Sequence, residues 1–142
     1  MIDGILSGEI YQILEKSMNA SSLQHTAITN NISNVDTPGY KRSEVVFQSK
    51  LEQVLYGRGK EYMPLALTHK NHIDIFPRLT INEIKPEIIA NNEMSSRQDG
   101  NNVDIDAEMA KLAQNTAYYS TIAGLVSLKL SSLQDVIHDG RR

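Results

Sequence analysis

The chain has 142 residues, of which 40% are hydrophobic and 22% charged, and its formal net charge is −3. This length suits one modest domain, and the slightly acidic balance without a basic cluster argues against a nucleic-acid-binding protein. The sequence has no cysteine, which excludes disulfides and thiolate metal sites. Aromatic residues make up only 6%, which favours narrow seams between helices over a thick globular core.

The first third of the chain predicts a long helix over residues 8–35. Its apolar residues recur in steps of three and four, and Ser21 and His25 are the weak positions of this stripe. The helix is expected to end at the turn 36–39, because Pro38 lacks an N–H and disfavours a helical conformation of the preceding residue. The main seam positions are Leu14, Met18, Ile28 and Ile32.

The start of the chain does not resemble a cleaved signal peptide. It lacks a cationic beginning followed by an uninterrupted apolar stretch. No apolar run in the sequence approaches the roughly 20 residues that a membrane-spanning helix needs. The expectation from these residues alone is a cytoplasmic protein, unless a route other than general secretion exports it.

The middle of the chain, residues 36–103, has a different texture. A short helix is expected over residues 47–56. Short apolar runs punctuated by prolines then predict extended segments, which include Ile73, Ile75, Leu79 and Ile81. Residues 90–102 are rich in Asn, Ser and Gly and predict a loop.

The strongest periodicity lies in residues 104–138, which predict a second long helix of about 50 Å. Three acidic residues fall in its first turn, where they complement the helix dipole. Apolar residues follow in alternating steps of four and three, as in a heptad pattern. The predicted seam comprises Ile105, Met109, Leu112, Tyr119, Val126, Leu130, Leu133 and Ile137, with Thr116 and Ala123 between them.

Together the two helices predict a mainly α fold, in which an antiparallel, coiled-coil-like pair flanks a small irregular middle with short β segments. Such a pair either satisfies itself as a hairpin or leaves one face for other copies of the chain. A second apolar set on the C-terminal helix, Leu125, Leu128 and Val136, lies outside the main seam and indicates more than one packing surface.

The sequence offers no convincing catalyst, and we predict no catalytic, cofactor or metal site. His69 and His72 form the only metal-like pair, but no glutamate base stands between them in a helical pattern. The stretch 57–60, GRGK, lacks the spacing and the Lys-Ser/Thr ending of a phosphate-binding loop. Asp104, Asp106 and Glu108 are explained by their place in the first turn of a helix.

Two stretches resemble one family. Residues 30–42, NNISNVDTPGYKR, resemble the N-terminal signature of the bacterial flagellar axial proteins, which are the rod, hook and hook-associated subunits; the chain departs from it at Thr29 and Ser33, where alanine is common. Residues 99–119, DGNNVDIDAEMAKLAQNTAYY, resemble the start of the C-terminal helix in proximal rod members. The signature residues are Asn30, Asn31, Asn34, Thr37, Pro38, Gly39, Tyr40 and Lys41.

The resemblance implies that residues 1–142 are a single axial subunit, which self-associates helically into a rod that crosses the periplasm and transmits motor torque to the hook. It implies export by the flagellar type III system without a cleaved signal peptide. The implied partners are other proximal and distal rod proteins, the basal-body adaptor FliE, the MS ring and the export gate; no nucleic acid or small-molecule substrate is implied. Another rod component of the family, or a soluble helical adaptor or chaperone, is the alternative.

We hypothesise that the signature shapes a joint between subunits. Its asparagines lie near a helix end, where amides can bond to backbone groups that the last turn leaves free. Pro38 and Gly39 redirect the chain, Tyr40 offers a flat anchor for a neighbouring helix, and Lys41 and Arg42 meet an acidic patch on the next subunit. The alternative is a self-contained helix cap and turn.

Overall fold

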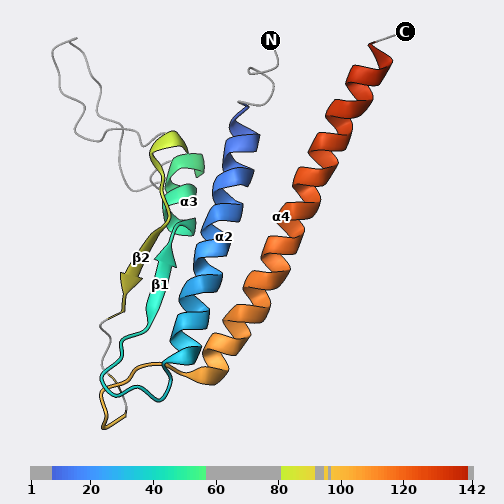
Figure 1. The fold of residues 1–142 in the computed structure, drawn as a ribbon. Helices are drawn as coiled ribbons and strands as arrows, with labels where there is room; N and C mark the ends of the chain where they lie inside the picture. The colour runs from blue at the N-terminus through green and yellow to red at the C-terminus, as the bar shows by residue number, and fades with distance from the viewer. Residues whose placement is uncertain (1–7, 57–80, 92–94, 96, 141–142) are drawn as a thin grey trace, which may run out of the picture.

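Two long antiparallel helices dominate the computed structural model, which describes residues 8–56, 81–91, 95 and 97–140. Helix α2 (Glu9–Ser33) begins at the end of the molecule where α4 (Ile105–Asp139) finishes, and α4 runs back beside it (Figure 1). The predicted fold class, a mainly helical chain with paired terminal helices and a small β element, is confirmed. The remaining elements are β1 (Ser43–Val46), α3 (Gln48–Tyr56), the 3-10 turn η1 (Ile81–Glu83) and β2 (Glu87–Ala90).

Helix α2 lies between α4 and a small layer made of β1, β2 and α3 (Figure 1). The strands pair antiparallel, with Ser43 opposite Ala90 and Val46 opposite Glu87. The buried apolar cluster sits on the strand side of α2, where Ala20, Phe47 and Ile84 meet. The densest apolar packing therefore joins α2 to the small layer and not to α4.

Small side chains let α2 be approached from two sides. Its buried residues include Ser17, Ala20, Ser21 and Ala27, and only Ile28 among them is large and apolar. The predicted seam residues Leu14, Met18 and Ile32 are half-buried. His25 is exposed, whereas Ser21 is buried and both donates to and accepts from Asn115 of α4, at 2.8 and 2.9 Å.

The face that α4 turns toward α2 differs from the predicted one by one residue at several turns. Glu108 and Ile122 are buried and Asn115 is half-buried, whereas the predicted Met109 and Thr116 are exposed and the predicted Ala123 is half-buried. The polar Glu108 and Asn115 face α2 because they form hydrogen bonds there, with Asn31 and Ser21 respectively. Leu112, Val126 and Leu133 are half-buried, as a seam requires. The prediction was wrong for five seam residues, which are 42–62% exposed: Ile105, Met109, Tyr119, Leu130 and Ile137.

The middle of the chain follows the prediction in part. Helix α3 occupies the expected place, whereas Ile81 begins a 3-10 turn and not an extended segment. The predicted extended positions Ile73, Ile75 and Leu79 lie outside the described residues. Across the ranges that the structure describes, no helix is both long enough and apolar enough to cross a bilayer.

Candidate assembly site

The two sequence motifs meet at the end of the molecule where α2 stops and α4 starts (Figure 1). Residues 30–44 run from the last turn of α2 into β1, and residues 99–111 run from a turn into the first two turns of α4. We call the contacts between these two segments the clasp. They are polar throughout, and they join parts of the chain that are about 60 to 80 residues apart in sequence.

Asn31 is the centre of the clasp. Its side chain is fully buried, and its Nδ2 donates to the backbone oxygen of Ser43 and to Glu108 Oε2, both at 2.9 Å. Its Oδ1 accepts from the backbone N–H of Ser43 at 2.8 Å and from Tyr40 Oη at 3.3 Å. Every donor and acceptor of this amide is thus occupied, which offsets the cost of burying it.

The contact between Asn31 and Ser43 also closes one edge of the sheet. Asn31 occupies both the N–H and the C=O of Ser43, as a neighbouring strand would do, and Gln24 Oε1 accepts from the N–H of Val45 at 3.1 Å. The backbone polar groups of Ser43 and Val45 point away from β2, because alternate residues of a strand direct these groups to opposite sides. Helix α2 therefore covers an edge that would otherwise be open to pairing.

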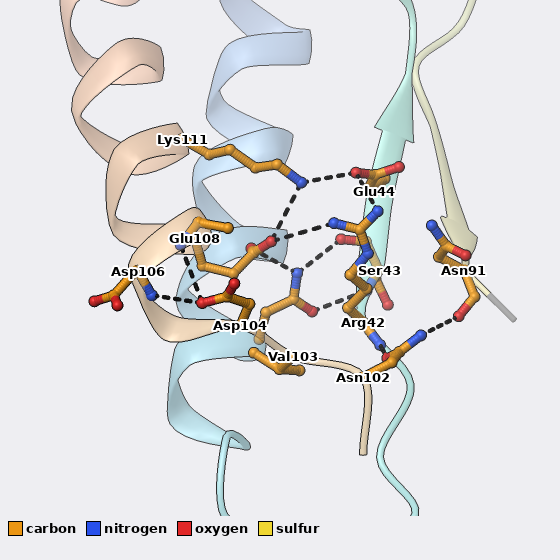
Figure 2. Close-up of polar contacts among 12 residues, drawn as sticks. Arg42, Ser43, Glu44, Asn91, Asn102, Val103, Asp104, Asp106, Glu108 and Lys111 are labelled. Carbon is orange, nitrogen blue, oxygen red and sulfur yellow. Dashed lines mark hydrogen bonds and ion pairs between the residues drawn. The ribbon is translucent and has the colours of Figure 1, made fainter. Parts of the chain in front are cut away.

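Four charged side chains surround the buried end of this network (Figure 2). Glu108 is only 1% exposed and lies 3.3 Å from Lys111 Nζ and 3.9 Å from Arg42 Nη1. The same two cations lie 2.8 and 3.2 Å from Glu44 Oε1. The hydrogen bond from Lys111, with the positive charges of Lys111 and Arg42, lowers the pKa of Glu44 below its ordinary value of 4.5. The cluster is neutral overall, as a partly buried set of charges must be.

Asn101 caps the C-terminal end of α2 from the other motif. Its Nδ2 lies 2.9 Å from each of three backbone oxygens, those of Asn34, Val35 and Thr37. Its Oδ1 accepts from the N–H of Val103 at 2.7 Å, and the side chain is 1% exposed. The last carbonyls of a helix and of the following turn have no partner within the helix, so one buried amide satisfies them here.

Asn102 and Lys41 extend the clasp to the strands. Asn102 Oδ1 accepts from the backbone N–H of Arg42 at 2.7 Å, and its Nδ2 donates to the backbone oxygen of Asn91 at 2.8 Å (Figure 2). Since the N–H of Asn91 donates to the oxygen of Arg42, the Asn102 side chain continues the sheet ladder by one position. Lys41 Nζ donates to the backbone oxygen of Gly100 at 2.8 Å.

Two glycines with positive φ shape the turns that face each other. Gly39 has φ +73° and Gly100 has φ +77°, a region that other L-residues adopt only at a cost. The N–H of Gly39 donates to the oxygen of Asp99 at 2.9 Å, and a Cβ on Gly100 would lie 3.8 Å from Gly39 Cα. The backbone N–H of Asn101, with Arg97, lowers the pKa of the Asp99 carboxyl.

Most of the signature therefore bonds within its own chain. Asn34 Nδ2 donates to the oxygen of Asn30 at 2.8 Å, as expected of an amide at a helix end, and its Oδ1 accepts from Thr37 Oγ1. Lys41 and Arg42 are both engaged with residues of the same chain, and their contact with the next subunit stays a prediction. The side chains of Asn30 and Pro38 are exposed.

Sequence reasoning missed Glu108, Asn101 and Gln24 as members of the site. Asn101 belongs to the second motif, residues 99–119, and a contact between the two motifs would have indicated it as a member of the site. Glu108 was assigned to the helix dipole, although its spacing of seven residues from Asn115 put both on one face. The predicted pair His69 and His72 lies outside the described residues, and no group of three metal-binding side chains occurs among the residues that the structure describes.

Comparison with a family model and comparison with individual known proteins indicate the same family. The family model of the flagella basal body rod protein matches residues 12–41, which end in the first motif. The chain is 34% identical over 137 residues to the flagellar basal body rod protein FlgB of Bacillus subtilis, covering 96% of this chain and 98% of that protein. The chain belongs to the FlgB family of flagellar basal body rod proteins. It is 32% identical to FlgB of Borreliella burgdorferi over 82% of this chain and 86% of that protein, and 27% identical to FlgB of Salmonella typhimurium over 89% and 91%.

This rod protein is accordingly a structural subunit of the flagellar basal body. The match of the family model runs through most of α2 and ends at Lys41, so it contains Asn31 and Asn34 and the turn between α2 and β1. The alignment at 34% identity covers 96% of the chain, so the relationship includes α4 and the second motif.

Proposed function

We propose that the subunit stacks helically with copies of itself and with other rod proteins, and that the resulting rod crosses the periplasm and transmits motor torque to the hook. The observation that carries this proposal is the distribution of apolar residues around α4. A helix with a single partner needs one apolar stripe, and an apolar surface on several sides is typical of a helix buried by several neighbours.

The exposed apolar residues of α4 lie on both flanks of its contact with α2. On one flank, five apolar residues are exposed, and they lie on nearly the same side of the helix because successive residues are rotated by about 100°. On the other flank, four further apolar or aromatic residues are exposed to a similar or greater extent. We call these flank A (Ile105, Met109, Tyr119, Leu130 and Ile137) and flank B (Tyr118, Leu125, Leu128 and Val136). Two different apolar surfaces on one subunit suit heterologous contacts, which generate helical stacks.

The clasp supplies the rigidity that a torque-bearing subunit needs. Its buried amides, Asn31 and Asn101, fix the end of α2 against the start of α4, and the ion-pair cluster around Glu108 ties both to β1. We propose that the signature residues Asn30, Asn31, Asn34, Thr37, Pro38, Gly39, Tyr40 and Lys41 serve assembly in this indirect way. They fix the angle at which the subunit presents α4, since satisfied polar networks specify one geometry.

The sequence resemblance supports three further parts of the proposal. The subunit leaves the cytoplasm through the flagellar type III system without a cleaved signal peptide, so it accumulates in the cytoplasm of an export-deficient strain. It contacts the adaptor FliE, the MS ring and the export gate at the base of the rod, and other rod proteins above. Fractionation of wild-type and export-deficient cells tests the first part, and pull-down of each neighbour from solubilised basal bodies tests the others.

The stacking itself is tested with a charge on flank A and a matched charge off both flanks. Leu130→Asp places a carboxylate in the proposed interface, and Ser131→Asp places one on the adjacent exposed residue, which points away from α2. We expect Leu130→Asp cells to lack rods in isolated basal bodies and not to swim, and Ser131→Asp cells to swim. Rods of normal length in Leu130→Asp cells would contradict the proposal.

A further inference from the structure

A groove about half-way along α2 is walled by β1 and the start of α3 on one side and by α4 on the other. Its volume is about 480 Å³. Ala20, Ser21 and Gln24 of α2 form the floor, and Val45, Phe47 and Gln48 belong to one wall. The other wall includes Gln114 and Tyr118 of α4, both exposed.

The groove is suited to an uncharged, apolar occupant. Its two charged lining residues, Glu44 and Lys111, are bonded to each other at 2.8 Å and so leave no isolated charge to attract a charged ligand. The remaining lining combines apolar side chains with uncharged polar groups, which are the amides, the Ser21 hydroxyl and the Tyr118 phenol; such a lining tolerates the side of a helix with few charges. A second helix laid along the groove would cover apolar surface that the chain leaves in water.

The wall formed by α4 continues into flank B. Tyr118, Leu125, Leu128 and Val136 fall within an arc of about 80°, because each step along them returns to nearly the same side at about 100° per residue. Leu128 and Val136 are 69% and 68% exposed. From Gly124 to Ile137 only Lys129 and Asp135 are charged, so this end of α4 has the uncharged, apolar character that the groove accepts.

A chain cannot fill its own groove with its own α4. Gln114 and Leu128 stand on one continuous helix, separated by 14 residues or about 21 Å. The groove and the apolar end of α4 are therefore two surfaces of one subunit that can meet only between copies. A contact between two different surfaces does not close on itself unless the rotation completes a ring, so it propagates from copy to copy.

We propose that the groove between β1 and α4 receives the C-terminal part of α4, residues 125–137, from a second copy of this chain. This inference rests on the proposed stacking of subunits and adds which surfaces meet. In the contact, Leu128 of one copy lies between the β1 wall and the α4 wall of the other, near Gln48 and Gln114.

The natural absence of cysteine allows a direct test by disulfide cross-linking. Cells produce two differently tagged full-length copies, one with a cysteine in the groove (Gln48→Cys) and one with a cysteine at the end of α4 (Leu128→Cys). Mild oxidation of basal bodies from swimming cells is expected to yield a disulfide dimer that carries both tags. Glu52→Cys, exposed on α3 and outside the groove lining, replaces the groove cysteine as the control and is expected to yield at least tenfold less mixed dimer.

Gln114→Cys tests the opposite wall independently, in case Gln48→Cys impairs folding. Swimming cells whose basal bodies give no mixed dimer from either groove position would overturn the inference and leave the proposed stacking intact, because swimming shows that rods formed. Dimers between two groove cysteines, or between two copies of Leu128→Cys, in place of mixed dimers would also overturn it, since they indicate a symmetric contact. Failure of the stacking proposal would appear separately, as normal rods in the Leu130→Asp strain.

Discussion

The amide nitrogen of Asn31 in α2 donates a 2.9 Å hydrogen bond to the carboxylate of Glu108 in α4, and the two residues are 0% and 1% exposed. This contact joins the last turns of one long helix to the first turn of the other. It also places a buried carboxylate within reach of Lys111 and Arg42. The two motifs, far apart in sequence, are thus two halves of one polar structure.

Removing the carboxylate should be costly. Glu108→Ala leaves Asn31 Nδ2 with one acceptor fewer in a buried site, and we expect the free energy of unfolding to fall by about 3 kcal/mol. Glu108→Gln should cost about half as much, because the amide oxygen still accepts from Asn31. Asp106→Ala, which removes an exposed acid from the same turn, should cost under about 1 kcal/mol. Urea unfolding followed by circular dichroism measures all three, and equal losses for Glu108→Ala and Asp106→Ala would show that Glu108 acts only on the helix dipole.

Asn101 offers a nearly isosteric test of the cap on α2. Asn101→Asp replaces the donor that serves three carbonyls with an acceptor, which brings oxygen atoms face to face in a buried site. We expect a loss of about 3 kcal/mol, larger than that of Asn101→Ala. The exposed Asn30→Asp should change stability by less than about 0.5 kcal/mol. Thermal unfolding compares the three, and a mild effect of Asn101→Asp would mean that this amide does not hold the end of α2.

The glycines predict effects of opposite sign. Gly39→Ala and Gly100→Ala force a side chain into a left-handed backbone conformation, and each should cost about 1–2 kcal/mol. Gly124→Ala lies in the interior of α4, where no atom beyond the adjacent backbone of the helix itself lies within 4 Å of the added methyl group. It should stabilise the isolated subunit by about 1 kcal/mol, since alanine is the better helix former. Melting temperatures that fall for Gly124→Ala would contradict this account of α4.

Charges introduced into the seam with α2 should block folding, whereas charges introduced on flank A should block rod assembly. Leu112→Asp or Val126→Asp puts a carboxylate against α2, so we expect unfolded or aggregated subunit, no rods and no motility. Met109→Asp changes an exposed residue, so the isolated subunit should keep its stability within about 0.5 kcal/mol while rod assembly fails. Circular dichroism of the purified subunits and motility in soft agar separate the two outcomes. Normal swimming of the Leu112→Asp or Val126→Asp strains would refute the seam.

The ion pairs around Glu44 predict a sensitivity to acid. Because Lys111 and Arg42 lower the pKa of Glu44 in the folded chain, the unfolded chain takes up the proton at higher pH. The stabilisation is therefore complete above pH 4.5 and is lost as the pH falls through the lowered pKa. Glu44→Gln should remove this part of the acid dependence, at a cost near neutral pH of under about 1 kcal/mol for so exposed a pair. Unfolding free energies measured from pH 7 to pH 3 check the slope, with Glu52→Gln on the exposed side of α3 as the control.

Local patterns were sufficient to predict the helices and the turn that ends the first of them. The spacing of apolar residues, Pro38 and the acidic residues before and after Ile105 are properties of short stretches, and they act wherever the rest of the chain lies. The same holds for Gly39, whose place in a Thr-Pro-Gly turn already indicated a special backbone conformation. The family followed from two motifs whose residues are adjacent in sequence.

The register of α4 could not be read from its sequence alone. Periodicity counts apolar residues, so it favoured Met109 over the polar Glu108, and the same alternating steps of four and three left Ile122 out of the predicted seam. The buried positions became clear only when the partners on α2 were known. A carboxylate is buried at position 108 because Asn31 donates to it and Lys111 lies beside it. The same is true of Asn115, which faces α2 because Ser21 bonds to it.

By itself, the sequence determined that this protein has two long helices, where the first one stops, and to which family of rod subunits it is related. Only the tertiary structure decided that Asn31 and Asn101 are buried amides, that Lys41 and Arg42 bond within their own chain, and which apolar residues of α4 remain exposed. The physical reason is that helix formation depends on neighbours along the chain. The burial of a polar group depends on a specific partner across space, and no local pattern names that partner.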